Sequence, residues 1–262
     1  MRTAQKERAR ESEKRIEGGN DMRYAFKSVK GLRSENQDSC YIPPKEAVPA
    51  AIVADGMGGH NAGLTASKLA VEAAVEFLNK NELADKQRQL REAVEYANKR
   101  IYSASLTEPE FSNMGTTFVA VIASSDELTA VNVGDSRVYV IDSSGIRRIS
   151  NDHSLVHELV LAGVLTEAAA KVHPYRNVIT RALGTHGVVE GDIFVCKWKD
   201  GDYALLCSDG LHGCMSDDEI ERIVKETPNM DEACEKLVSA ALFNGSTDNV
   251  TVVLVKNEEV CG

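Results

Sequence analysis

The sequence has no long hydrophobic run, no C-x-x-C pair and no excess of basic residues, and each absence excludes a class of protein. The longest apolar run, residues 47–54 interrupted only by Pro49, is far below the roughly 20 residues that a membrane-spanning helix needs. The six cysteines, at positions 40, 196, 207, 214, 234 and 261, form no C-x-x-C pair. That excludes a zinc ribbon and a thioredoxin-type redox site, and a disulfide scaffold is not expected at this chain length.

Basic residues are outnumbered by acidic ones. The 262 residues include 30 Lys and Arg against 40 Asp and Glu, which gives a formal net charge of −10. Duplex nucleic acid is therefore not expected as the main ligand, because phosphate backbones are bound by clustered Lys and Arg. With 43% hydrophobic residues the chain has enough apolar surface to fold.

The first residues mix basic and acidic side chains and contain no apolar segment of the kind found in a signal peptide. We expect residues 1–22 to form a solvated tail and residues 23–262 a single catalytic domain in a reducing cytoplasm. No linker or internal repeat divides the chain.

The hydrophobic pattern predicts an α+β domain. Short connections between the central strands force antiparallel neighbours, because a parallel crossover needs a dozen or more residues. Apolar residues at a 3.6-residue period predict amphipathic helices that lie outside the sheets. The predicted helices are 63–80, 85–105, 217–226 and 231–244, with a mostly helical stretch over 154–183. The predicted strands are 24–29, 50–54, 116–123, 128–133, 137–141, 146–149, 193–198, 203–207 and 249–255.

Four aspartates share one local pattern, an apolar strand with an Asp at its end beside Gly, Ser or Asn. They are Asp55, Asp135, Asp209 and Asp248. Any one of them alone is more typical of a turn, since Asp tolerates turn conformations. Together, carboxylates at the ends of central strands can converge on one edge, where their repulsion requires a cation. Oxygen ligands without His or Cys favour Mg²⁺ or Mn²⁺ over zinc.

The glycine-rich stretch after Asp55, DGMGGHNAG (residues 55–63), invites comparison with nucleotide-binding loops. The dinucleotide fingerprint fails because Asn61 stands where its third glycine belongs, and the P-loop fails because Leu64 occupies the lysine position. What remains is a flexible backbone beside a carboxylate, which could bring the Gly56 carbonyl onto a metal.

Two further groups of polar residues are candidates for binding a phosphoryl group or a metal. Arg33, five residues before Asp38, is a candidate phosphate ligand because a guanidinium presents a planar fork of donors to a phosphoryl group, although a single Arg is more often a surface residue. His153 and His157, four residues apart, could chelate zinc on a helix, but no third ligand follows at a known spacing. A role in a helix surface or flap is the preferred interpretation.

Seven stretches together resemble the metal-dependent serine/threonine protein phosphatases of the 2C type, particularly the bacterial branch. They are GLRSENQDS (31–39), VADGMGGHNAG (53–63), MGTTFVA (114–120), VNVGDSRVY (131–139), HPYRNVITRALG (173–184), LLCSDGL (205–211) and STDNVTVVLV (246–255). They occur in the order of the family. The resemblance implies a four-layer α/β/β/α sandwich of two antiparallel sheets flanked by helix pairs.

The resemblance also implies a role for each matched residue. Asp55 would bridge two metal ions, the Gly56 carbonyl would bind one of them, and Asp209 and Asp248 would complete the first site. Asp135 would share an additional ion with Asp209. Arg33 would bind phosphate, and Asp38 would orient a metal-bound water or contact the metal. A water held by two or three Mn²⁺ or Mg²⁺ ions would then attack phosphorus directly, without a phosphoenzyme.

Two positions depart from the animal members of the family. Gln37 stands where those enzymes carry Glu, which puts one water-mediated metal contact in doubt. Met57 replaces the His that follows the Asp-Gly pair, so the usual proton donor to the leaving alkoxide is absent. His60 and a metal-bound water are the alternative donors.

The expected function is dephosphorylation of phosphoserine and phosphothreonine in signalling proteins, by a monomer opposed by a serine/threonine kinase, with no nucleic-acid or membrane partner. A catalytically silent binding module of the same fold is the alternative, and a metal-dependent nuclease is disfavoured by the net charge. Residues 154–183, punctuated by Gly163 and Pro174, are expected to form a mobile flap that tunes access of protein substrates.

Overall fold

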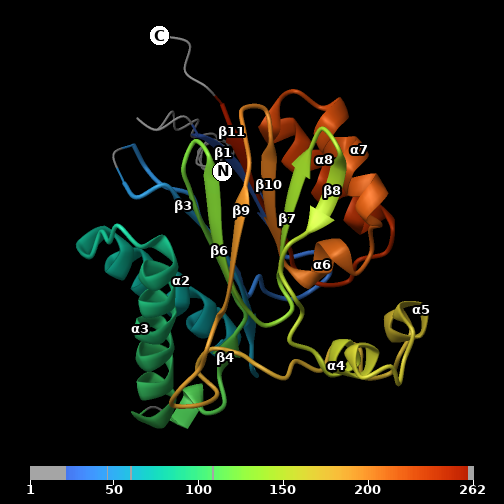
Figure 1. Cartoon of the computed structure of the whole chain (residues 1–262). Coiled ribbons are helices and arrows are strands. Elements are labelled where there is room, and N and C mark those ends of the chain that lie inside the picture. Colours follow the sequence, from blue (N-terminus) through green and yellow to red (C-terminus); the bar gives the residue numbers. More distant parts are fainter. Residues whose placement is uncertain (1–21, 46, 60, 108, 259–262) are drawn as a thin grey trace, which may run out of the picture.

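The computed structural model describes residues 22–45, 47–59, 61–107 and 109–258. Two antiparallel sheets lie face to face in the centre, with α2 and α3 on one side and α6, α7 and α8 on the other (Figure 1). The strands are β1 (Met22–Val29), β2 (Asp38–Tyr41), β3 (Ala50–Met57), β4 (Gly115–Thr116), β5 (Phe118–Ala123), β6 (Glu127–Val133), β7 (Arg137–Asp142), β8 (Gly145–Arg148), β9 (Asp192–Lys197), β10 (Tyr203–Cys207) and β11 (Val250–Asn257). The helices are α2 (Ala62–Lys80), α3 (Lys86–Thr107), the 3-10 helix η1 (Pro109–Phe111), α4 (Leu155–Leu161), α5 (Glu167–Lys171), α6 (Asp209–His212), α7 (Asp217–Glu226) and α8 (Met230–Phe243).

Each sheet combines strands that are distant in the sequence. One has the order β1-β11-β10-β7-β8, and the other has the order β2-β3-β5-β6-β9 with the short β4 paired to β3. In the first sheet the strands before Asp209 and after Asp248 are neighbours, because β10 pairs with β11. In the second, β2 pairs with β3 so that Asp38 lies directly opposite Asp55. The topology therefore brings carboxylates from four segments to one end of the sandwich.

Three layers of buried apolar side chains hold the sandwich together. In β3, Ile52 and Ala54 pack under α2 and α3, while Ala51 and Val53 face the other sheet. A third cluster lies between the β1-containing sheet and helices α7 and α8. Because successive strand residues point to opposite faces, a strand buried on both faces is apolar throughout, as β5 and residues 50–54 of β3 are.

The helices begin and end where their sequences predict. Helix α7 starts with a capping box, in which the Ser216 side chain accepts from the Glu219 main-chain N–H and the Glu219 side chain accepts from the Ser216 N–H. Helix α2 presents alanines at positions 66, 70 and 74 to the core, all buried. Such small side chains at a four-residue spacing let α2 approach both α3 and the sheet closely.

Most of the predicted elements are confirmed within two residues at their ends. Two predicted strands and the stretch 154–183 differ, and some short elements were not predicted. The strand predicted over 50–54 continues to Met57, so Asp55 lies within β3 instead of after it. The glycine at position 56 does not end the strand, because Gly56 and Met57 pair with β4. The strand predicted over 116–123 is two strands, β4 and β5. Strand β2 and the short helix α6 were not predicted, because each is too short to show a period.

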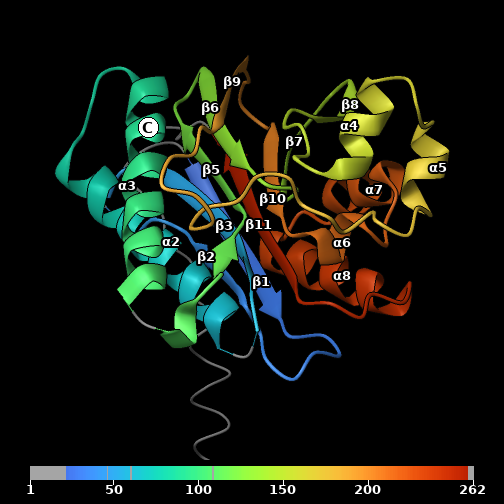
Figure 2. The same cartoon turned by 90° about the horizontal axis from the view of Figure 1, so that it is seen from below.

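The stretch 154–183 is less helical than its apolar pattern predicts. It contains two short helices, α4 and α5, followed by a chain without regular structure. A bridge between Ser154 and Ile179 joins the two ends of the stretch, and a bridge between Leu183 and Thr116 of β4 returns it to the sandwich. Both helices have a hydroxyl N-cap, Ser154 and Thr166. In Figure 2, α4 and α5 lie to one side of the sandwich, away from α2 and α3. We call residues 154–183 the flap segment.

Within the described part of the chain, no helix is both long and apolar enough to cross a membrane.

Replacing Phe118 by Ala tests the core under α2 and α3. Phe118 is fully buried there, so Phe118→Ala should lower the free energy of unfolding by about 3–5 kcal/mol. Val195→Ala on β9 is the control, since that side chain is 43% exposed and its loss should cost below about 1 kcal/mol. Urea denaturation of both variants measures the difference, and equal losses would contradict this description of the core.

Candidate metal and phosphate site

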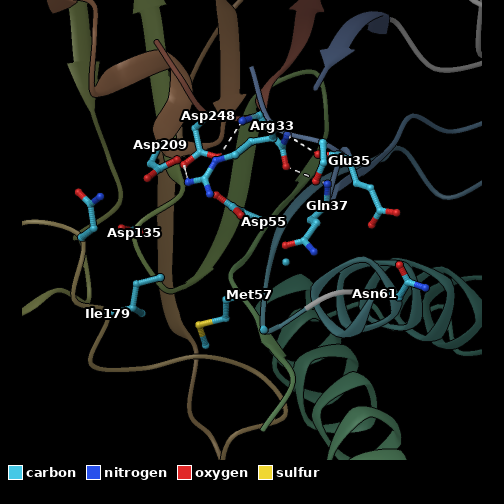
Figure 3. A pocket seen from close by; sticks show the side chains of 15 residues that line it. Arg33, Glu35, Gln37, Asp55, Met57, Asn61, Asp135, Ile179, Asp209 and Asp248 are labelled. Carbon is cyan, nitrogen blue, oxygen red and sulfur yellow. Dashed lines mark hydrogen bonds and ion pairs between the residues drawn. The ribbon is translucent and has the colours of Figure 1, made fainter. Parts of the chain in front are cut away.

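A pocket of about 540 Å³ opens at the end of the sandwich where the four aspartate segments meet. Asp55, Asp135, Asp209 and Asp248 all line it, together with Arg33 (Figure 3). The flap segment contributes Asn177 and Ile179; the other lining residues are Ser34, Glu35, Gln37, Gly56, Met57, Gly58, Asn61 and Asn249. The convergence that was predicted from four separate strand ends is thus present.

Asp55 is held through its main chain by two threonines, the last residue of β4 and the residue after it. Its N–H donates to the Thr117 hydroxyl at 2.9 Å, and its carbonyl accepts from the Thr116 hydroxyl at 2.8 Å and from the Thr117 N–H at 2.9 Å. The Thr117 hydroxyl also lies 2.7 Å from that of Ser136, the residue after Asp135. The main chain of Asp55 is therefore tied to the turn that carries Asp135.

Gly56 must be glycine because neighbouring main chains approach it closely. A Cβ atom at this position would lie 2.0 Å from the Gly63 carbonyl oxygen and 2.7 Å from that of Gln37. The Gly56 N–H donates to the same Gln37 carbonyl. The glycine-rich stretch thus serves close packing between β3, the start of α2 and the loop before β2.

Arg33 and Asp248 form an ion pair in the pocket. The Arg33 guanidinium donates to Asp248 Oδ2 at 2.6 Å, and Figure 3 shows it reaching between Asp248 and Asp209. Asn249 fixes the loop that carries Arg33, because its side-chain amide donates to the carbonyls of Lys30 and Glu35 and its oxygen accepts from the Gln37 N–H. The sequence pattern alone does not indicate this role of Asn249.

Asp38 lies deepest in the group. Its side chain is 6% exposed, Oδ2 accepts from the Ser208 hydroxyl at 2.8 Å, and Oδ1 is buried without a partner among the described residues. Asp209 Oδ1 is likewise buried and unpartnered there. Ser208, which was not singled out from the sequence, also accepts from the Thr251 N–H and so joins β10, β11 and Asp38.

Asp135 occupies the turn between β6 and β7 and is 7% exposed. Two histidines contact the main chain of this turn. His212 Nε2 lies 3.0 Å from the Asp135 carbonyl oxygen, and His153 Nδ1 accepts from the Gly134 N–H at 3.1 Å. Neither ring contact was predicted. His153 Nε2 lies 3.2 Å from Asp192 Oδ2, so both of its ring nitrogens have protein partners and the zinc alternative for His153 and His157 is not supported.

Burial and mutual repulsion raise the pKa values of these carboxyls. Desolvation, the largest cause in each case, and neighbouring carboxylates raise the pKa of Asp38 to about 7, that of Asp135 to about 8 and that of Asp209 to about 6. The pKa of Asp55 is raised well above its ordinary value for the same reasons. Such a group of acids is costly to ionise unless positive charge is brought to it.

The donor set fits a hard divalent cation. All of the candidate ligands are oxygens, two buried carboxylate oxygens have no partner among the described residues, and the charge of Arg33 offsets only part of the repulsion. In the described residues, however, no three acidic, His or Cys side chains already stand in a metal-binding arrangement. Asp248 is paired with Arg33 through Oδ2, and its Oδ1 accepts from the Asn249 N–H.

The structure brings together the residues predicted for the site: Arg33, Asp38, Asp55, Gly56, Asp135, Asp209 and Asp248. Asp38 lies behind the pocket rather than in its lining. Gln37 and Met57 both line the pocket. His60, the alternative proton donor, and residues 1–21 of the expected tail lie outside the described residues.

Comparison with known proteins agrees with this geometry. Residues 30–244 match the family model described as protein phosphatase 2C. The chain belongs to the protein phosphatase 2C family. The serine/threonine phosphatase Stp of Listeria monocytogenes is 37% identical over 246 residues, which are 90% of this chain and 96% of the relative. PstP of Mycobacterium tuberculosis is 37% identical over 234 residues, or 89% of this chain and 44% of that longer protein.

Solved structures give the same result. The M. tuberculosis PstP/Ppp structure superposes with a TM-score of 0.84 at 36% identity and covers 91% of this chain and 99% of that one. Stp1 of Staphylococcus aureus gives a TM-score of 0.85 at 34% identity, with 94% and 99% covered. The predicted family, the predicted four-layer fold and the predicted enzyme class, a metal-dependent serine/threonine protein phosphatase, are confirmed.

The raised pKa values predict how stability depends on pH in the metal-free protein. A carboxyl whose pKa is raised in the folded state does not destabilise the protein below its unfolded pKa of about 4. Its cost grows as the pH rises from there to the folded pKa and is constant above it. We therefore expect the melting temperature measured in EDTA to fall between pH 5 and pH 8. Asp55→Asn removes one repelling charge and should reduce the fall.

Thermal melting of both proteins at a series of pH values measures this effect. A melting temperature that rises over the same range in the wild type, or a steeper fall in Asp55→Asn, would contradict the assignment of mutual repulsion to these carboxyls.

Proposed function

We propose that this chain hydrolyses phosphoserine and phosphothreonine in proteins by direct attack of water, with Mn²⁺ or Mg²⁺ bound by Asp55, the Gly56 carbonyl, Asp209 and Asp248. Asp135 is proposed to share a further ion with Asp209. The observation that carries the proposal is the convergence of these carboxylates with one guanidinium in a single pocket. The catalytic domain of the similar PstP was solved with two manganese ions.

Bound ions would supply positive charge at the phosphoryl group and lower the pKa of the attacking water. Side chains of the protein position the phosphoryl group and the water. Arg33 binds the equatorial phosphoryl oxygens, and its side chain is 58% exposed, so it can swing from Asp248 to a substrate. Asp38, buried behind the pocket opposite Asp55, is proposed to orient a metal-bound water or to contact the metal.

No phosphoenzyme is expected. The described lining of the pocket contains no Cys or His, and its one serine, Ser34, has no histidine base beside it in that lining. Met57 lines the pocket at the position where animal members carry the histidine donor, and a thioether cannot donate a proton. The leaving alkoxide must therefore take its proton from another group.

The proposal is tested by release of phosphate from a phosphothreonine peptide with Mn²⁺ or Mg²⁺, with and without EDTA. We expect turnover with metal and none after chelation. A protein that binds the peptide with metal but releases no phosphate would favour the silent binding module. Full activity after exhaustive chelation would exclude metal-dependent chemistry.

Asp55→Ala and Asp248→Ala should each abolish turnover while the fold persists. Removal of one ligand weakens metal binding more than it weakens the sandwich, and in the metal-free state it relieves repulsion. Phosphate release at saturating Mn²⁺ and circular dichroism are the measurements. Near wild-type turnover in either variant would refute the assignment of that residue as a ligand.

Arg33→Ala should separate phosphate binding from metal binding. We expect kcat/KM to fall roughly tenfold to a hundredfold, because a charged hydrogen bond to the phosphoryl group is lost. Mn²⁺ affinity should stay the same or increase, since Arg33 no longer competes for Asp248. Unchanged kcat/KM together with weaker metal binding would show that Arg33 has a structural role.

We also propose that the flap segment tunes access of protein substrates. It contributes Asn177 and Ile179 to the pocket lining, and Val172 and Tyr175 expose 79% and 60% of their surface to solvent. Exposed apolar side chains on a segment that also lines the pocket are suited to contact a polypeptide. A cytoplasmic location, a monomeric state and an opposing kinase stay predictions.

Replacing both exposed side chains, Val172→Ser with Tyr175→Ser, tests the role of the flap segment. Turnover of a phosphoprotein should fall roughly fivefold to thirtyfold, the usual effect of losing apolar anchors. Turnover of p-nitrophenyl phosphate, which needs only the central pocket, should not change. Val195→Ser on β9 is the control. Equal loss on both substrates with a lower melting temperature would mean that the segment is only structural.

A further inference from the structure

The turn that carries Asp135 is held by a hydrogen bond from His212, a residue that the catalytic scheme does not use. His212 Nε2 lies 3.0 Å from the Asp135 carbonyl oxygen. A carbonyl oxygen can only accept, so the Nε2 atom of His212 carries the proton and donates it.

His212 belongs to the same helical turn as Asp209. Helix α6 consists of Asp209–His212 only, and the Gly213 N–H donates to the Asp209 carbonyl at 2.8 Å, which closes the turn. The turn cannot shift toward β11, because a Cβ atom on Gly210 would already lie 2.0 Å from the Asn249 carbonyl oxygen. Asp209 and the His212 ring are thus carried by one rigid unit.

The hydrogen bond of His212 therefore links the two segments that supply Asp135 and Asp209. Asp135 lies in the turn between β6 and β7, and Asp209 follows β10. Strands β7 and β10 are neighbours in one sheet, where Arg137 lies opposite Cys207. This pairing sets the approximate distance between the two carboxylates, and the His212 bond ties the turn before β7 directly to the turn after β10.

We propose that His212 is a positioning residue, whose hydrogen bond to the Asp135 carbonyl sets Asp135 against Asp209 and so raises the affinity of the ion that they share. This inference rests on the proposed metal role of Asp135. Groups that orient metal ligands from outside typically change metal affinity roughly tenfold to a hundredfold.

Loss of the His212 bond should leave the turn folded, because His153 holds it from the other side. The Gly134 N–H donates to His153 Nδ1, and the His153 N–H donates to the Gly134 carbonyl at 2.9 Å. The expected effect is thus a displaced carboxylate in a folded protein.

The test is a Mn²⁺ titration of the full chain, with free Mn²⁺ measured by electron paramagnetic resonance. His212→Leu removes the donor, while His212→Gln keeps an N–H donor. Asn244→Ala is the matched control, since the Asn244 side chain donates to the Cys214 carbonyl in the loop after α6 and is not bonded to Asp135. Asp135→Asn reports whether Asp135 binds an ion at all.

We expect His212→Leu to weaken the most weakly bound class of ions roughly tenfold, with the tighter ions and the metal-free melting temperature unchanged. His212→Gln should recover most of this affinity, and Asn244→Ala should match the wild type. Wild-type binding by His212→Leu, no recovery in His212→Gln, or a uniform loss of all ions with a lower melting temperature would each overturn the inference.

The Asp135→Asn variant separates the two proposals. If it loses no ion, the proposed metal role of Asp135 fails and the role of His212 fails with it. If it loses an ion while His212→Leu does not, the role of Asp135 stands and only the inference about His212 is overturned.

Discussion

Repulsion among buried carboxylates is the constraint on which the rest of this structure depends. Asp38, Asp55, Asp135 and Asp209 are gathered at one end of the sandwich, where burial and their neighbours raise their pKa values. Such an arrangement opposes folding, so it has to be held by something stronger than side-chain contacts. The main chain holds the carboxylates in place, because each Asp lies in a helix or strand of the sandwich or in a short turn next to one.

The two-sheet architecture is suited to that task. Its inter-sheet layer is apolar, with Val53, Val119 and Val253 among its buried members, and it fixes the sheets relative to one another. Short polar side chains then join the strand ends, as Thr117 does between Asp55 and Ser136 and as Ser208 does between Asp38 and Thr251. Hydrophobic packing sets the approximate position of each carboxylate, and these hydrogen bonds refine it.

Sequence reasoning reached much of this arrangement, and its limits have physical causes. The long helices α2 and α3 and the buried strands were predictable because a regular period repeats over many residues. Strand β2 and helix α6 have only four residues each, too few to show a period. The convergence of the aspartates was predictable from their strand ends.

The residues that hold the aspartates in place were harder to predict. Their hydrogen bonds reach main-chain groups that are distant in the sequence. Asn249 bonds to the main chain of residues 30–37, Ser208 to that of residue 251 and His212 to that of residue 135. The spacing of neighbouring residues does not indicate such a partner, because in the sequence these residues look like any other polar residue in a turn. The Arg33–Asp248 pair was also not expected, because the two residues were assigned to different ligands.

That ion pair suggests how the centre keeps its acidic cluster folded before metal arrives. Arg33 is the cation bonded to Asp248, and its charge also reaches Asp209 and Asp55. Only one nitrogen of the guanidinium is bonded to Asp248, and the Arg33 side chain is 58% exposed, so its other donors are open to the pocket. One guanidinium is therefore placed both to offset the acidic cluster and, in the proposed function, to bind the phosphoryl group.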